Sequence, residues 1–285
     1  MFRRRHPTKA SWWLCALTSV SLAVAAFPTV AAPRADLWER WTAHDPGATA
    51  TIDHSSWDGF LKTYVSVFPD GVNRVAYAHV SDADRKRLDR YIDDLTALAI
   101  SAYSRDEQRA YWINLYNALT VQVILDHYPV KSIRQIKPNL FSVGPWRKKL
   151  ITVEGEQLSL DDIEHRILRP IWRDPRLHYA VNCAAIGCPN LQTEAYTAAN
   201  ADTLLDRGAR AYVNNPRGVA FRNGRLIVSS IYEWFQEDFG NSDEGVIGHL
   251  RRYAEPPLAA RLNGTKRIAG DRYDWALNDD ATVPK

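Results

Sequence analysis

The stretch Ala110-Tyr-Trp-Ile-Asn-Leu-Tyr-Asn-Ala-Leu-Thr-Val-Gln-Val-Ile-Leu125 is apolar on nearly every side of a helix. Such a helix is buried all round, so we expect it at the centre of the fold. Ser104 and Glu107 form a capping-box pair before it, and Pro129 forces it to stop nearby, so the helix should cover residues 105–127.

Two amides interrupt this apolar helix. Asn114 and Asn117 lie three residues apart, with Tyr111 and Val121 on the same side. Because buried amides must be hydrogen-bonded, we expect them to tie neighbouring loops to the core. The alternative is that they line a site.

Patterns on both sides of the central helix predict an α+β domain, rich in helices, with short β-strands and a C-terminal β-hairpin. Asn223-Gly224 marks the turn of that hairpin. Before the central helix we expect a helical lead-in over 38–80 and a helix over 82–100. After it we expect a strand at 150–153, a helix from Ser159 to before Pro170, a buried strand at 177–183, a loop at 184–190, hairpin strands at 219–222 and 225–228, and helices at 231–239 and 246–253.

The first residues have the order of a secretory signal peptide. Arg3, Arg4, Arg5 and Lys9 precede an apolar stretch over 12–27, and small residues follow at 26–32. We predict a signal peptide over residues 1–32 and one globular domain over 33–285, in the periplasm or secreted. The apolar stretch is shorter than the roughly 20 residues of a spanning helix, so a retained anchor is the weaker alternative.

Removal of this signal changes the charge balance. It takes four of the 36 Lys and Arg and none of the 33 Asp and Glu, which leaves 36 − 4 = 32 basic against 33 acidic residues. The remaining domain has no basic excess to attract nucleic acid. It also has no second apolar stretch of membrane length, so the expected partner is a small-molecule or peptide substrate.

The cysteines that remain after signal removal are Cys183 and Cys188. Alternation along the expected strand puts His178 and Asn182 on one face and Cys183 on the other, where it reads as a core thiol. Cys188 follows Gly187 and precedes Pro189, a position where free backbone N–H groups would lower the thiol pKa, so Cys188 is the candidate nucleophile. A Cys183–Cys188 disulfide and, more weakly, a zinc site with His165 or His178 remain alternatives.

Adjacent Glu164 and His165 lie on the helix after Ser159. Glu164 borders the buried face marked by Ile163, and His165 should point further out. The simpler account is that the acids of the first turn stabilise the helix dipole. Asp238 shares a helix face with Trp234, and we expect a surface ion pair or hydrogen bond for it.

Four stretches together resemble one family, the domain of unknown function 547. They are Glu107-Gln-Arg-Ala-Tyr-Trp-Ile-Asn-Leu-Tyr-Asn-Ala-Leu119, His127-Tyr-Pro-Val-Lys-Ser-Ile133, Ser159-Leu-Asp-Asp-Ile-Glu-His-Arg-Ile-Leu-Arg169 and His178-Tyr-Ala-Val-Asn-Cys-Ala-Ala-Ile-Gly-Cys-Pro-Asn-Leu191. The resemblance covers about 77–214, with 229–239 as the family's tail element, and puts the domain core at about 77–254. The sequence departs from the family at Ala185 and Asn190.

The resemblance implies that a set of residues matters in this family, but it implies no activity. These residues are Asn114, Tyr116, Asn117, Glu164, His165, His178, Cys183 and Cys188. The family includes intracellular plant members with the same two cysteines, where a disulfide would rarely persist, and this favours a thiol role.

The leading hypothesis is therefore a hydrolase or acyl transferase that acts on an amide or peptide without a metal or other cofactor. Cys188 would attack, His165 would serve as base and acid, and Glu164 or Asn182 would orient the imidazole. His178 is the alternative base. A non-catalytic envelope protein, in which these residues hold a binding groove or the core, is the alternative from another class.

Overall fold

The computed structural model describes Met1, residues 33–139 and residues 142–282. The predicted signal peptide thus falls, apart from Met1, outside the described residues. Contacts divide the chain into residues 1–31 and residues 32–285, and every element named below belongs to the second unit. Within the described ranges, no helix has both the length and the apolar character needed to cross a membrane.

The fold is α+β and is built around α3 (Arg105–His127), whose bounds match the predicted helix. Ser104 Oγ accepts the backbone N–H of Glu107 at 3.4 Å, which is the serine half of the predicted capping box, while the Glu107 carboxylate accepts the Ile52 N–H at 3.2 Å. Every residue from 107 to 121 is buried. The apolar surface on all sides of this segment is covered, which makes α3 the centre of the main hydrophobic core.

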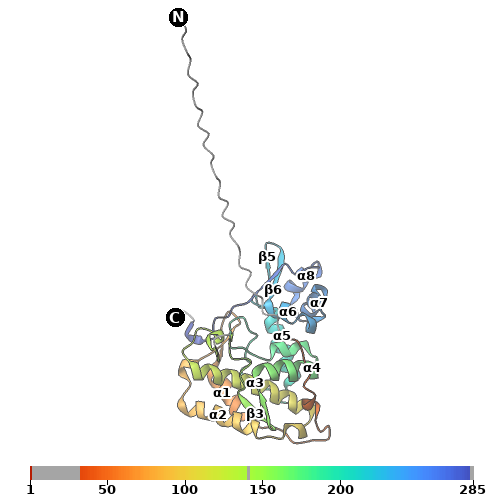
Figure 1. The fold of residues 1–285 in the computed structure, drawn as a ribbon. Helices are drawn as coiled ribbons and strands as arrows, with labels where there is room; N and C mark the ends of the chain where they lie inside the picture. Colours follow the sequence, from red (N-terminus) through yellow and green to blue (C-terminus); the bar gives the residue numbers. More distant parts are fainter. Residues whose placement is uncertain (2–32, 140–141, 283–285) are drawn as a thin grey trace. The chain divides into compact units, whose positions relative to one another are not determined.

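Two hydrophobic clusters fill the domain. Helices α1 (Ser55–Tyr64) and α2 (Asp82–Thr96) pack with α3 in the larger one, as Figure 1 shows. The smaller cluster lies among α5 (Ala201–Val213), α7 (Asp243–Tyr253) and the strands between them. The polar residues of the candidate site described below lie on segments that connect these two cores.

The strands of the described residues form three small sheets. β5 (Val219–Arg222) and β6 (Arg225–Ser229) make the predicted C-terminal hairpin, and β7 (Gly270–Arg272) adds a parallel strand to it. The remaining elements are η1 (Glu39–Thr42), β1 (Val65–Val67), β2 (Asn73–Val75), η2 (Tyr77–His79), η3 (Ile100–Ala102), η4 (Ile133–Gln135), β3 (Ile151–Val153), β4 (Glu156–Leu158), η5 (Asp162–Leu168), α4 (Arg169–Trp172), η6 (Pro175–Tyr179), α6 (Ser230–Trp234), η7 (Gln236–Phe239), α8 (Pro256–Asn263) and η8 (Asp280–Thr282).

The two amides of α3 are buried and bonded, as predicted. Asn114 donates to Tyr196 O at 2.7 Å and accepts the Tyr196 N–H at 3.0 Å. Asn117 donates to Ala180 O at 2.8 Å and accepts the Asn182 N–H at 2.8 Å. Each amide holds a loop backbone against the central helix, which is the first of the two predicted roles.

Three predicted elements are wrong. The lead-in over 38–80 is not wholly helical, because β1 and β2 form a hairpin around Pro69-Asp70-Gly71. The helix after Ser159 does not end before Pro170, since α4 continues through it. The buried strand at 177–183 is absent: Asp174 caps a 3-10 helix, η6, and a turn follows it. Asp174 at the cap and Pro175 at the first position are typical of the start of a helix. The strand prediction rests instead on the apolar run that follows them.

Candidate active site

The segment after Ser159 begins with a reciprocal cap and continues as a helix of the wider π type. Ser159 N–H donates to Asp162 Oδ2 at 2.9 Å, and Asp162 N–H donates to Ser159 Oγ at 3.2 Å. From Asp162 to Leu168 the chain forms a π-helix, η5, instead of the expected α-helix. Single π turns are rare and occur frequently at functional sites.

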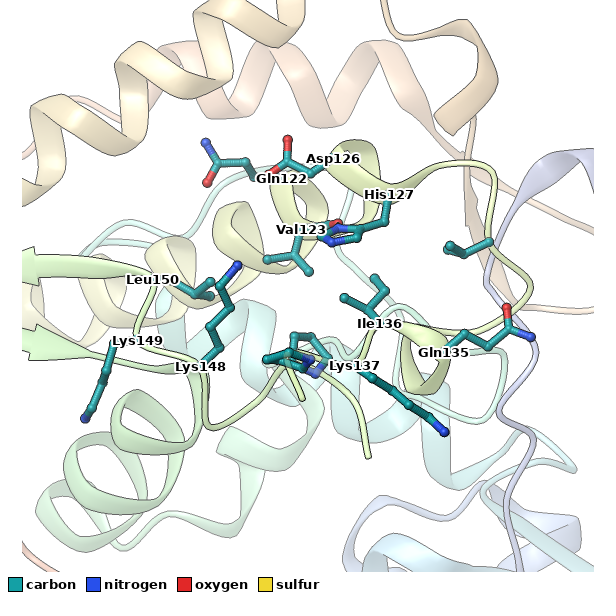
Figure 2. A pocket seen from close by; sticks show the side chains of 13 residues that line it. Gln122, Val123, Asp126, His127, Gln135, Ile136, Lys137, Lys148, Lys149 and Leu150 are labelled. Carbon is teal, nitrogen blue, oxygen red and sulfur yellow. The ribbon is translucent and has the colours of Figure 1, made fainter. Parts of the chain in front are cut away.

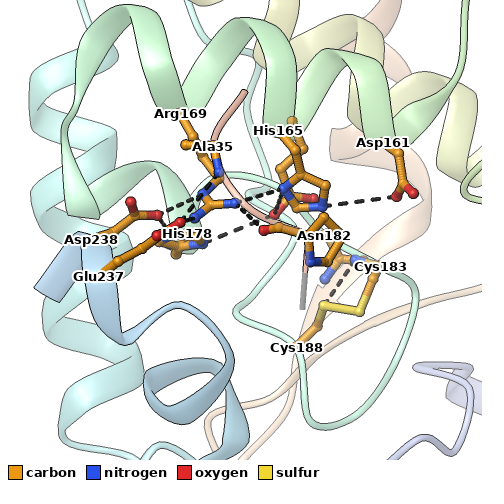
Figure 3. Close-up of polar contacts among 12 residues, drawn as sticks. Ala35, Asp161, His165, Arg169, His178, Asn182, Cys183, Cys188, Glu237 and Asp238 are labelled. Carbon is orange, nitrogen blue, oxygen red and sulfur yellow. Dashed lines mark hydrogen bonds and ion pairs between the residues drawn. A yellow bond between two sulfur atoms is a disulfide. The ribbon is translucent and has the colours of Figure 1, made fainter. Parts of the chain in front are cut away.

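Glu164 and His165 both turn inward from this π-helix. Glu164 is 9 % exposed and His165 is 6 % exposed, so the expectation that His165 points outward is wrong. Together with the buried Arg169 and His178 and the half-buried Asp238 they form a polar group, called the histidine cluster below (Figure 3).

His178 and Arg169 both make short contacts with Asp238 in the histidine cluster. His178 Nε2 lies 2.6 Å from Asp238 Oδ2, and the Phe235 ring stacks on the imidazole at 4.5 Å. Arg169 Nε donates to the same carboxylate oxygen at 2.6 Å. Burial raises the pKa of Asp238, but the hydrogen bonds from His178 and Arg169 outweigh it and lower that pKa to about 2. Asp238 is therefore an anion, and it fixes the Nε2 side of the His178 ring.

Arg169 also determines the state of His165. Its Nη1 donates to His165 Nδ1 at 3.1 Å, so the ring proton of a neutral His165 must be on Nε2, which lies 3.8 Å from Asp161 Oδ1. Burial is the main reason that the pKa of His165 falls to about 4. His165 is thus neutral at pH 7, and its lone pair is already occupied by an arginine.

Glu164 lies between the two imidazoles without bonding either. Its Oε1 is 3.9 Å from His165 Nδ1 and 4.0 Å from His178 Nδ1, which exceeds a hydrogen bond. Burial, followed by the charge of Glu164, raises the pKa of Asp161 to about 6, with Arg147 acting against them. The Asp161 carboxyl, next to His165, is therefore protonated below about pH 6.

The two cysteines form a disulfide in this structure. Cys188 is buried, at 4 % exposure, whereas Cys183 is partly exposed and its Sγ lies 3.1 Å from Tyr273 Oη. The expected order is thus reversed, because Cys183 lies on a turn instead of a strand. Gly187 is needed for close approach, since a Cβ there would lie 2.7 Å from the Asp274 nitrogen.

Asn182 does not take the orienting role expected of it. Its Nδ2 donates to Pro189 O at 2.7 Å, and its Oδ1 accepts the Ala184 N–H at 2.8 Å. Both contacts brace the turn that carries the cysteines. The prediction relied on a strand that would pair Asn182 with His178, and that strand does not form.

Three members of the site were missed from the sequence: Asp238 as the partner of His178, Arg169 and Phe235. Arg169 is 4 % exposed and binds both Asp238 and Glu237, the latter at 2.8 Å. Asp238 does share a predicted helix face with Trp234, but nothing in the sequence could place the segment 235–239 against residues 165–178.

A separate cavity of about 530 Å³ lies against the C-terminal half of α3, where Val123 and His127 line it together with Ile136 and Leu150 (Figure 2). None of its lining residues belongs to the histidine cluster. Over the described part of the chain, no group of three or more His, Cys, Asp and Glu side chains is arranged to hold a metal ion.

The family model for a protein of unknown function, DUF547, matches residues 100–213. That segment includes α3, the π-helix, His178 and both cysteines, and it ends before Asp238. No curated protein and no solved structure match the chain.

Proposed function

The chain carries the domain of unknown function DUF547, and from its site we propose a cysteine-dependent hydrolase or acyl transferase that acts on an amide or peptide. The observation that carries the proposal is the 2.6 Å contact between His178 and Asp238 in a buried cluster on the same domain as two cysteines. A base held by a carboxylate is the arrangement that activates a thiol nucleophile.

His178 is the base in this proposal, in place of His165. Its Nε2 is held by Asp238, so the lone pair on Nδ1 is available. His165 instead accepts a hydrogen bond from Arg169 and is a poor acceptor for a second proton. Glu164, 4.0 Å from His178 Nδ1, would stabilise the imidazolium that forms after proton transfer.

Cys183 is the nucleophile in this proposal, because its side chain is the more exposed of the two. A dithiol first reduces the disulfide by two electrons. His178 then takes the proton of the Cys183 thiol, the thiolate attacks the carbonyl carbon, a C–S bond forms, the C–N bond breaks, and His178 gives that proton to the leaving amine. Water or a second amine takes the acyl group and restores the thiol.

A non-catalytic role is the second candidate, and specific observations favour it. The thiols are joined, and the side chains of Arg169, His165 and His178 are only 2 %, 7 % and 3 % exposed. In that case the cluster joins the two cores of an envelope protein and binds its ligand without chemistry.

Export is part of the proposal. The basic residues at 3–9 and the apolar stretch at 12–27 support a cleaved signal peptide and a periplasmic or secreted domain. Mass spectrometry of the protein from its host should then find a first residue between Ala26 and Arg34. An intact Met1 on the folded protein would contradict this.

Iodoacetamide labelling tests the enzyme directly. We expect no labelling of the folded protein until dithiothreitol is added, and then faster labelling of Cys183 than of Cys188. His178→Gln should slow the labelling of Cys183 at pH 7 by about tenfold, the effect of about one unit in thiol pKa.

Two variants serve as controls for that measurement. His165→Gln should change the rate little, because its lone pair is used by Arg169. His249→Gln replaces a buried histidine that bonds Tyr179 in the other core, and it should change nothing. If Cys183 is labelled at the same rate in all variants, the enzyme proposal is wrong and the non-catalytic role is the one that remains.

A further inference from the structure

Residues 33–38, called the strap below, run across the histidine cluster without helical or sheet structure of their own. Arg169 Nη1 donates to Pro33 O at 2.7 Å, and the Ala35 N–H donates to Glu237 Oε1 at 3.3 Å. Figure 3 shows Ala35 next to Arg169 and Glu237. The strap is therefore held by the same arginine that binds His165 and Asp238.

Two further hydrogen bonds join the strap to the π-helix. The N–H groups of Asp36 and Trp38 donate to His165 O and Arg166 O, each at 3.0 Å. These donors are two residues apart, which is the spacing of an extended chain that presents alternate N–H groups to one side. The strap thus pairs its backbone with two consecutive carbonyls of the π-helix.

Pro170 explains why those carbonyls are free. A π turn would pair His165 O with the N–H of residue 170, and an α turn would pair Arg166 O with the same N–H. Proline has no N–H, so neither bond can form. The sequence of the helix thus creates two unpaired acceptors beside the candidate site, and the strap satisfies both.

One arginine recognises the side chains of the strap. Arg166 lies 3.6 Å from the carboxylate of Asp36 and 4.4 Å from the centre of the Trp38 ring. The remaining hydrogen bonds go to the strap backbone, while the Trp38 ring also packs edge-on against Trp41 and the main core. The two side chains that Arg166 contacts are thus an acidic residue and, two positions later, an aromatic one.

The carboxylates that pair with the strap are exposed, whereas its backbone and Trp38 are held more closely. The Asp36 side chain is 77 % exposed, Glu237 is 45 % exposed, and Leu37 is exposed as well. Exposed ion pairs contribute little to stability, so the strap is held mainly by its backbone hydrogen bonds and by Trp38, contacts that another extended segment with an aromatic residue could also make.

We propose that the strap occupies, in cis, a groove that receives an extended peptide segment of the pattern acid, any residue, aromatic, and that such a segment is the ligand class of the site. Only the statement that this ligand is a substrate rests on the proposed function. Binding itself requires the groove residues Arg166, Arg169 and Glu237 and not the cysteines.

The test uses the full chain with Asp36→Pro, which removes a strap N–H and its carboxylate. A fluorescein-labelled peptide of residues 33–41 should bind this variant at least tenfold more tightly than it binds the unchanged chain, measured by fluorescence anisotropy. Adding Arg166→Ala should abolish the gain, whereas Arg173→Ala, on an arginine outside the groove, should not. The same peptide with proline at position 36 should bind neither protein.

Equal binding to the variant and the unchanged chain, with unaltered circular dichroism, would overturn the proposal. If Asp36→Pro does not fold, hydrogen exchange on the unchanged chain decides: excess peptide must speed exchange of the Asp36 and Trp38 amides. Unchanged protection of both amides would also overturn it. Thiol labelling is read separately, so loss of the enzyme proposal does not affect this result.

Discussion

Arg169 is the residue that organises the polar centre of the domain. It donates to a histidine, an aspartate, a glutamate and the strap carbonyl of Pro33. Its guanidinium also lies 4.7 Å from the centre of the Phe235 ring. A buried arginine is stable only when its charge is compensated, and here Asp238 and Glu237 supply the opposite charges. The tautomer of a neutral His165 follows from this one side chain, and the anionic state of Asp238 follows from its hydrogen bonds with both His178 and Arg169.

Asn117 carries the sharpest prediction at the residue scale. Asn117→Leu removes both of its bonds and strands Ala180 O and the Asn182 N–H, each at a cost of about 1–3 kcal/mol. We expect the free energy of unfolding in urea to fall by at least about 2 kcal/mol. Gln122→Leu makes the same chemical change on a half-buried position of α3 and should cost under about 1 kcal/mol.

Equal effects of these two substitutions would mean that the Asn117 amide does not hold the loop. Asn114→Leu should match Asn117→Leu, because it strands the corresponding groups of Tyr196.

At the scale of elements, the sequence predicts a helix or strand correctly where the residues that define it lie within the segment itself. The capping pair, the apolar run and the proline after it define α3 within the segment itself, and the Asn-Gly turn does the same for β5 and β6. No local signal distinguishes the π turns of η5 from an α-helix, and the carbonyls of His165 and Arg166 are paired with strap donors more than 120 residues away. His178 and Asp238, 60 residues apart, meet only through tertiary packing, so their pairing could not be predicted.

The disulfide closes a loop of six residues, and its contribution to stability should be correspondingly small. Replacing both Cys183 and Cys188 with Ala should lower the free energy of unfolding by about 2 kcal/mol, the loop-closure value for that length. The turn should keep its shape, because Ala184 O and the Gly187 N–H are paired with residues 278 and 274.

Calorimetry with and without dithiothreitol checks this. Reductant should lower the melting temperature of the unchanged protein and leave the double variant unaffected. No shift in the unchanged protein would mean that the thiols are free in solution.

On the scale of the whole molecule, the two cores are joined by polar side chains that come from several elements and are largely removed from water. The histidine cluster takes residues from η5, η6 and η7, while His54 and His249 are buried near α1 and in α7, at 4 % and 7 % exposure. Folding therefore removes at least three imidazoles from water. Each of them must be neutral in the folded state or pay the cost of burying a charge.

Stability should consequently depend on pH in a defined window. Burial is the largest cause that lowers the pKa of His54, His165 and His249 to about 4 from 6.5. Between these values the unfolded chain binds more protons, so the contribution is complete above pH 6.5 and is lost as the pH falls toward 4. Asp161, with a pKa raised to about 6, acts in the opposite direction, but one carboxyl offsets only part of three imidazoles.

Urea unfolding followed by tryptophan fluorescence at pH 4.5, 5.5, 6.5 and 7.5 measures this balance. The unfolding midpoint should rise up to pH 6.5 and then stay level, because each histidine contributes of order 1–3 kcal/mol over the window. His54→Gln should remove about a third of the rise, since it deletes one of three titrating groups, while His79→Gln, at an exposed position, should leave the slope unchanged. A midpoint that falls with increasing pH would mean that Asp161 outweighs the histidines, and a flat profile would mean that the imidazoles reach water in the folded state.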